Sequence, residues 1–269
     1  MKLSVFYDHV IEASEQTGKS ITEILANVRN CGIEALEIRL SHLQESRDVI
    51  EQIKEVGLGI SCIFEFYDMG IRDETKKIRQ HLNMAKELQA PNIMIVPGFL
   101  HGDDVNRLKS VMQEKTLLTA FFDSHQEVKR MAEGINMAVD MGKKLGIKVL
   151  FEDFDDFSSP MSGKNGVDWF LEKCPEVGYA LDCGNFIMYD EDVLDAFEKF
   201  SARICHVHCK DRAKEVVAVG EGRIPIKEVV STLLESGYNG YFAIEHFDAK
   251  NQMDCIKKSA CYLRSISIK

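Results

Sequence analysis

The chain has 269 residues, of which 45% are hydrophobic and 28% charged, and its formal net charge is −10. This composition is typical of a globular protein, and the negative charge argues against one whose main work is to neutralise nucleic-acid phosphates. The eight cysteines form no CxxC pair, no apolar run reaches membrane-spanning length, and the opening MKLSVFYDHV does not resemble a secretory leader. We therefore expect a reduced, cytoplasmic protein without membrane or nucleic-acid partners.

Short β-rich stretches alternate with amphipathic helical stretches along the whole chain. The predicted strands cover residues 3–8, 33–40, 59–66, 92–98, 147–153, 179–186, 203–211 and 241–247. The predicted helices cover residues 21–32, 46–57, 73–90, 125–146, 165–175, 192–202, 224–237 and 251–266. Four glycines, Gly32, Gly57, Gly146 and Gly237, stand where a helix should stop before a strand. Eight such units predict a single α/β domain, a (β/α)8 TIM barrel over residues 1–269.

One long excursion interrupts the alternation after the fourth strand. Residues 99–124 are predicted to form an insertion in a βα loop. Such a segment could cover the mouth of the barrel as a lid, or it could be a helix that contacts another subunit or has no role in the site.

Four residues that can bind metals stand at or near the ends of the last four predicted strands. They are Glu152, Asp182, His208 and Glu245. In a barrel these strand ends meet at the face where the βα loops build the active site, and three carboxylates there would repel one another without a cation between them. The sequence therefore predicts one site for Mn²⁺, Mg²⁺ or Co²⁺, with Zn²⁺ as an alternative. Each residue taken alone could instead form a salt bridge at a strand end.

The seventh predicted strand carries two histidines in the stretch RICHVHCKDR. Because side chains alternate along a strand, His206, His208 and Lys210 should share one face, and the cysteines and valine between them the other. We expect His208 to face inward as a ligand, His206 to support it from one layer deeper or to bind substrate, and Lys210 to stand at the mouth and bind substrate. The alternative is a pair of buried histidines with ordinary hydrogen bonds.

Four short motifs, in the order of the chain and each closing a predicted strand, resemble the xylose-isomerase-like TIM barrels. The motifs are FED at 151–153, LDCGN at 181–185, HVHCKD at 206–211 and IEH at 244–246. The resemblance is greatest to the sugar phosphate isomerases and epimerases, a group that includes ketose 3-epimerases, hydroxypyruvate isomerases, and inosose isomerases and dehydratases. It implies that one divalent metal is held by the four residues named above, with Glu152 and Glu245 also acting as catalytic acid and base.

The chemistry implied by this resemblance is proton transfer beside a carbonyl group. A metal that chelates the carbonyl oxygen and the neighbouring hydroxyl oxygen stabilises an enediolate after the carbon loses its proton. Return of the proton to the opposite face gives epimerisation, and return to the adjacent carbon gives isomerisation. Loss of a β-hydroxyl instead gives dehydration, so the same ligands support three outcomes.

The chain departs from the family pattern at two positions. Asn185 stands where the epimerases and the related endonucleases commonly have a histidine, and Val96 stands where the endonucleases have another. An amide is a poor metal ligand, so Asn185 is predicted to bind substrate hydroxyls, or to be only a turn residue. These departures and the acidic charge argue against DNA repair.

Further substrate-binding candidates lie near the expected site. Lys210 and Arg212 could bind a phosphate or carboxylate, with Asp211 orienting the lysine. Glu37, at the end of the second strand, could bind hydroxyls or pair with a neighbour, and Glu221 is a candidate in the VGEGRIP loop.

We therefore expect a metal-dependent isomerase or epimerase of a small sugar, keto-polyol or sugar phosphate. The alternatives are a lyase similar to inosose dehydratase and a non-catalytic sugar-binding barrel. The proteins that the chain resembles are commonly dimers or tetramers, so a homo-oligomer is expected.

Overall fold

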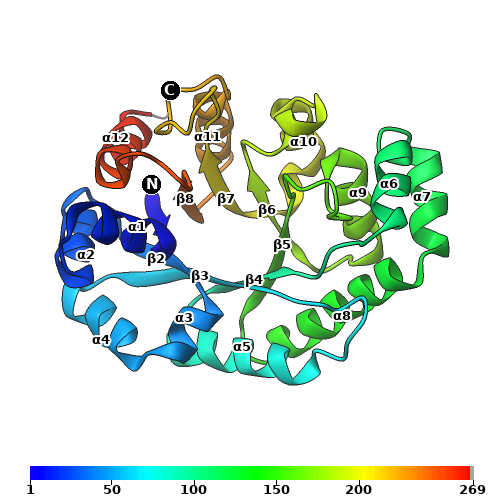
Figure 1. The fold of residues 1–269 in the computed structure, drawn as a ribbon, viewed down its shortest axis with the longest axis horizontal. Helices are drawn as coiled ribbons and strands as arrows, with labels where there is room; N and C mark the ends of the chain where they lie inside the picture. The colour runs from blue at the N-terminus through cyan, green and yellow to red at the C-terminus, as the bar shows by residue number, and fades with distance from the viewer. Residues whose placement is uncertain (267–269) are drawn as a thin grey trace. The chain divides into compact units, whose positions relative to one another are not determined.

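The structure is a computed structural model and describes residues 1–266. Eight parallel strands follow one another in chain order around a closed barrel, which confirms the predicted (β/α)8 fold (Figure 1). The last three residues of the predicted 1–269 domain lie outside the described residues. The strands are β1 (Lys2–Phe6), β2 (Ala35–Arg39), β3 (Gly59–Phe66), β4 (Asn92–Val96), β5 (Lys148–Glu152), β6 (Gly178–Asp182), β7 (Ile204–Lys210) and β8 (Tyr241–Glu245).

The α-helices of the described residues are α1 (Tyr7–Thr17), α2 (Ile21–Asn30), α3 (Leu40–Glu45), α4 (Arg47–Val56), α5 (Thr75–Glu87), α6 (Asp103–Val111), α7 (Lys115–Ser124), α8 (Gln126–Lys143), α9 (Gly163–Lys173), α10 (Val193–Phe200), α11 (Ile226–Glu235) and α12 (Gln252–Ser265). Two short 3-10 helices, η1 (Phe186–Tyr189) and η2 (Ser201–Arg203), lie on either side of α10. No helix among residues 1–266 is long and apolar enough to span a bilayer.

The chain divides into two compact units. The first unit comprises Met1–Ile63 and the segment from His206 onward, and the second comprises Phe64–Cys205. In the first unit β1 pairs with β2 and β8, and β7 pairs with β8. Helices α1, α2 and α12 pack against one another beside these strands (Figure 1).

In the second unit β5 lies between β4 and β6. Helix α8 packs against β5 and against α5, with its apolar residues turned inward. The predicted insertion at 99–124 contains α6 and α7, and α7 packs against α8 and α9. Whether this segment covers a substrate stays a prediction.

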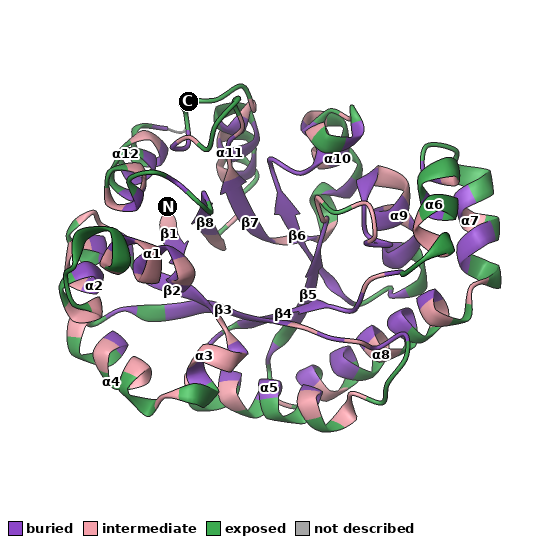
Figure 2. Cartoon of the chain, in the orientation of Figure 1, coloured by how far each residue is buried: buried purple, intermediate pink, exposed green. Residues whose placement is uncertain are grey.

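The strands are buried along almost their whole length, while the helices expose one face (Figure 2). This pattern is expected of parallel strands covered by helices, because both faces of each strand are then removed from water. The four predicted helix-stop glycines all have positive φ angles, between 71° and 85°. At Gly57, for example, the left-handed conformation lets its N–H bond back to the last turn of α4.

In the first unit, helices α1 and α3 were not predicted. The first predicted strand, 3–8, ends at Phe6, and α1 begins at Tyr7 without an intervening loop. Likewise α3 begins at Leu40, directly after β2. Helix α1 starts inside the apolar run at residues 5–7, and α3 is only six residues long. Periodicity over so few residues does not distinguish a strand from a helix.

Candidate metal centre

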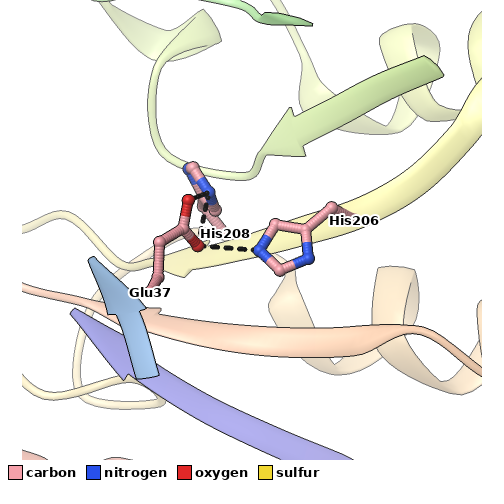
Figure 3. Close-up of side chains that lie close together, drawn as sticks. All are labelled: Glu37, His206 and His208. Carbon is pink, nitrogen blue, oxygen red and sulfur yellow. Dashed lines mark hydrogen bonds and ion pairs between the residues drawn. The ribbon is translucent and has the colours of Figure 1, made fainter. Parts of the chain in front are cut away.

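The first unit contains a buried carboxylate between two histidines. Glu37 comes from β2, and His206 and His208 come from β7; all three side chains are fully buried. Oε2 of Glu37 lies 2.7 Å from Nε2 of His206, and Oε1 lies 3.2 Å from Nε2 of His208 (Figure 3). Burial raises the pKa of Glu37, but the charges and hydrogen bonds of His208 and His206 outweigh this effect and lower it to about 2. Glu37 is therefore an ionised acceptor for both rings.

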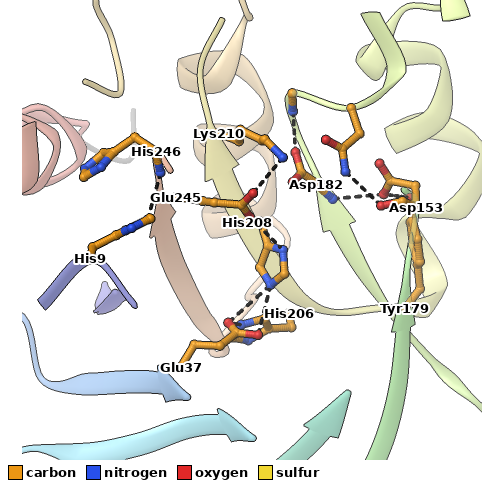
Figure 4. A network of polar contacts seen from close by, with 12 residues as sticks. His9, Glu37, Asp153, Tyr179, Asp182, His206, His208, Lys210, Glu245 and His246 are labelled. Carbon is orange, nitrogen blue, oxygen red and sulfur yellow. Dashed lines mark hydrogen bonds and ion pairs between the residues drawn. The ribbon is translucent and has the colours of Figure 1, made fainter. Parts of the chain in front are cut away.

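A second carboxylate lies on the other side of His208. Oε2 of Glu245 is 3.3 Å from Nδ1 of His208, and Oε1 is 2.7 Å from Nζ of Lys210 (Figure 4). Pairing of β7 with β8 explains this arrangement, because Lys210 is in register with Glu245 and the two side chains share a face. Burial raises the pKa of Glu245, but Lys210 and then His208 lower it far more, so the carboxyl is strongly acidic.

Two further histidines pack behind Glu245. The backbone N–H of His246 donates to Nε2 of His9 at 2.9 Å, and the two rings stack with centroids 4.7 Å apart. Burial, and then the nearby His9, lower the pKa of His246 to about 3, so its ring is neutral. Neither residue was expected to have a role from the sequence. The only signal was helical spacing, which places His9 on the buried face of α1 with Val10 and Ala13.

The second unit contributes two carboxylates from adjacent strands. Glu152 ends β5 and Asp182 ends β6, and a carboxylate oxygen of one lies within 4.8 Å of a carboxylate oxygen of the other. The backbone N–H of Gly184 donates to Oδ1 of Asp182 at 2.6 Å, which orients that carboxylate. Both acids are buried, Glu152 being 8% exposed and Asp182 fully buried.

Asp153, next in the chain to Glu152, links β5 to β6. Its Oδ1 accepts hydrogen bonds from the hydroxyl of Tyr179 and, at 3.0 Å, from the backbone N–H of Asp182. Burial raises the pKa of Asp153 to about 7 despite these bonds. Asn185 donates from Nδ2 to the backbone carbonyl of Asp153 at 2.9 Å and is almost completely buried. It therefore ties the β6 end to the β5 end; its binding of substrate stays a prediction.

The loop after β7 carries the remaining candidates. Asp211 was expected to orient Lys210, but its carboxylate accepts from the backbone N–H groups of its own loop. These donors belong to Arg212, Gly220, Gly222 and Ile224, at 2.8 to 3.1 Å. Glu221, a predicted substrate-binding residue, pairs with Lys258 on α12 at 3.1 Å, and both are about half exposed. Roles of Arg212 and Glu221 in substrate binding stay predictions.

The donor set of each unit suits a hard divalent cation. If Nε2 of His208 carries the proton that Glu37 accepts, Nδ1 is left with a lone pair facing a carboxylate oxygen of Glu245 3.3 Å away. Two acceptors at this distance repel unless a proton or a cation lies between them. Ligands of one divalent ion, bound at about 2.1 Å each, lie about 3 Å apart. The spacing of His208 and Glu245 therefore fits a pair of metal ligands.

The most similar curated relatives include the inosose dehydratase of Clostridium tetani, 24% identical over 196 residues, which are 64% of this chain and 63% of the relative. The chain thus spans less than two thirds of that relative's length.

Two solved structures share the fold. The probable 3-DHS dehydratase involved in petrobactin synthesis from Bacillus anthracis is 18% identical, with a TM-score of 0.74 over 99% of this chain and 100% of the other. D-psicose 3-epimerase from Clostridium cellulolyticum is 15% identical, with a TM-score of 0.74 over 99% of each chain. At these identities the likeness concerns the fold. The family model for xylose isomerase-like TIM barrels, in contrast, matches residues 25–266 of the sequence itself. The predicted family is thereby confirmed, and the chain belongs to the xylose isomerase-like TIM barrels.

Proposed function

We propose that the protein is a divalent-metal-dependent isomerase or epimerase of a small sugar, keto-polyol or sugar phosphate. In this proposal Glu152, Asp182, His208 and Glu245 together hold one ion, with Mn²⁺, Mg²⁺ or Co²⁺ preferred to Zn²⁺. The observation that carries the proposal is the buried contact of His208 Nδ1 with Glu245 Oε2, whose separation of 3.3 Å fits two ligands of one ion. The buried pair Glu152 and Asp182 at the ends of β5 and β6 supports it independently.

The two glutamates are the proposed acid and base. When bound, the metal acts as a Lewis acid toward the carbonyl and neighbouring hydroxyl oxygens of the substrate. One glutamate takes the proton from the carbon beside the carbonyl, and the electron pair of that C–H bond forms the enediolate. The other glutamate, which enters the step protonated, returns its proton to the opposite face of the same carbon in epimerisation. In isomerisation the proton goes to the adjacent carbon, and the proton of the neighbouring hydroxyl moves to the former carbonyl oxygen. Lys210, 2.7 Å from Glu245, keeps that carboxyl ionised and therefore able to accept a proton.

A lyase of the inosose dehydratase kind is the second candidate, and the similarity of the sequence to inosose dehydratases favours it. It would use the same first step, abstraction of the proton beside the carbonyl. The intermediate would then expel a β-hydroxyl as water, with Glu152 or Glu245 donating the proton that leaves with it. The cytoplasmic location and the homo-oligomer expected from the sequence stay predictions.

The test is solvent exchange of the substrate proton. Protein freed of metal and reloaded with Mg²⁺ or Co²⁺ is incubated in D₂O with ketoses, inososes and their phosphates, and proton NMR follows the signal beside the carbonyl. We expect metal-dependent deuterium uptake that falls at least 100-fold in Glu245→Gln and Glu152→Gln. Glu191→Gln, which changes a carboxylate that accepts a hydrogen bond from the backbone N–H of Lys164, should retain full uptake.

The reaction products distinguish the isomerase or epimerase from the lyase. A labelled epimer or isomer supports the first proposal, and an unsaturated product formed with loss of water supports the lyase. Metal binding without uptake from any substrate would overturn both and leave a non-catalytic sugar-binding protein.

A further inference from the structure

We propose that Glu37 is a positioning residue that fixes the proton of His208 on Nε2 and so keeps Nδ1 available as a metal ligand. This inference rests on the proposed function, because it takes His208 as one of the metal ligands. It assigns Glu37 a role different from the substrate contact expected from the sequence. Its side chain is fully buried and both of its oxygens face histidine rings, so its effect on the reaction passes through those rings.

The argument begins with proton counting. An ionised carboxylate only accepts hydrogen bonds, so each Nε2 that contacts Glu37 must carry a proton. At a pH where the imidazoles are neutral, each ring has one proton, which leaves Nδ1 with a lone pair. For His208 that lone pair faces Glu245 at 3.3 Å, on the side of the ring opposite Glu37 (Figure 4). A carboxylate hydrogen-bonded to the far nitrogen of a metal-binding histidine is a recurrent way of fixing tautomer and ring orientation.

His206 explains how Glu37 itself is held. Its bond to Oε2 is the shortest in the cluster, at 2.7 Å, and the two rings lie edge to face with centroids 5.3 Å apart. Nδ1 of His206 is buried and has no hydrogen-bond partner among residues 1–266. The Nε2–H group of His206 therefore donates its hydrogen bond to Glu37. Phe6 packs its ring against the edge of His208 at a centroid distance of 5.1 Å, which further limits rotation of that ring.

The amide variant Glu37→Gln makes a sharp test, because an amide has one acceptor and one donor end. If the amide NH₂ faces His206, that ring must move its proton to Nδ1, where no partner is available within residues 1–266. If the NH₂ faces His208, the proton moves to Nδ1 of His208, where Glu245 can accept it. The second arrangement leaves fewer buried groups unsatisfied, so the variant should switch the tautomer of His208.

The measurement is long-range ¹H–¹⁵N NMR of metal-free protein, at a pH where the rings are neutral. We expect His208 in the Nε2–H form in the unaltered protein and in the Nδ1–H form in Glu37→Gln. Affinity for Mn²⁺, measured by calorimetry, should fall 10- to 100-fold in the variant. Glu191→Gln, the matched loss of a carboxylate away from the histidines, should change neither result.

An Nδ1–H form of His208 in the unaltered protein would overturn the proposal, even if Glu37→Gln failed to fold. Unchanged tautomer and unchanged Mn²⁺ affinity in a folded Glu37→Gln would also overturn it. Neither measurement uses a substrate, so the absence of deuterium uptake in the exchange experiment would count against the proposed function alone.

Discussion

Lys210 and Glu245 form an ion pair in the first unit. Their contact is 2.7 Å, Lys210 is 16% exposed in its side chain and Glu245 6%, so solvent screens the interaction weakly. The ammonium group has two opposing effects on a nearby cation site. It keeps Glu245 ionised as a ligand, and it repels a bound cation as a like charge.

These effects predict a pH-dependent outcome for Lys210→Met. The folded-state pKa of Glu245 lies below its ordinary value, so removing Lys210 raises it and protonates the ligand at a higher pH. Near pH 5 the variant should therefore bind Mn²⁺ more weakly than the unaltered protein, because protons then compete with the ion for Glu245. Near pH 8, where Glu245 is ionised in both proteins, binding should be equal or tighter. Calorimetric titration at both pH values measures the difference, and equal weakening at both would contradict the argument.

Side-chain alternation on β7 could be read from the sequence, whereas the partners of those side chains could not. His206 and His208 share a face, as predicted, and both contact the same carboxylate. That carboxylate, Glu37, is 169 residues earlier in the chain than His206. The sequence left open whether Glu37 binds a hydroxyl or pairs with a neighbour. In the structure its carboxylate pairs with His206 and His208. His9 was missed for the same reason, since its partner His246 is 237 residues away.

At the scale of elements, the loop between β7 and α11 is organised by one side chain. The Asp211 carboxylate accepts four backbone N–H groups and is 5% exposed. A buried ionised carboxylate with several backbone donors is among the stronger polar arrangements in proteins.

Asp211→Ala should therefore loosen this loop and destabilise the protein. The loss of charge-assisted bonds and the exposure of buried amides should lower the free energy of unfolding by about 2–4 kcal/mol. Urea denaturation measures that loss, and hydrogen exchange should accelerate at the amides of Gly220, Gly222 and Ile224. Glu215→Ala removes an exposed carboxylate of the same loop, one that pairs with Lys250, and should leave the free energy of unfolding almost unchanged. Equal effects of the two variants would show that Asp211 has no special role.

Regular elements with clear periodicity were predictable, and those that begin inside an apolar run were not. The eight strands and the long helix α8 follow from alternation and from spacing of apolar residues. Helix α1 was missed because FY at its start continues the apolar character of β1. In addition, no N-cap side chain forms the hydrogen bond that usually marks the beginning of a helix.

At the scale of the whole molecule, the proposed ligands are distant in the sequence, since Glu152 and Glu245 are separated by more than ninety residues. An unfolded chain cannot hold them together, so the metal should bind only the folded protein. Added Mn²⁺ at 100 times its dissociation constant should then raise the free energy of unfolding by about 2.7 kcal/mol relative to chelator-treated protein. Thermal and urea unfolding with and without metal measure this difference. Asp182→Asn should remove most of it, and a melting temperature indifferent to metal would contradict the proposed site.

The Asp211 loop also has a consequence for protein engineering. The carboxylate binds backbone amides, so the anchor does not depend on which side chains occupy most of the loop. Gly222 is an exception, since a Cβ there would lie 2.1 Å from Asp211, and Gly220 is another because of its positive φ and the ring of Tyr262. Positions 221 and 223 are free of these restrictions. A library randomised at those two positions could vary substrate preference while the loop keeps its course.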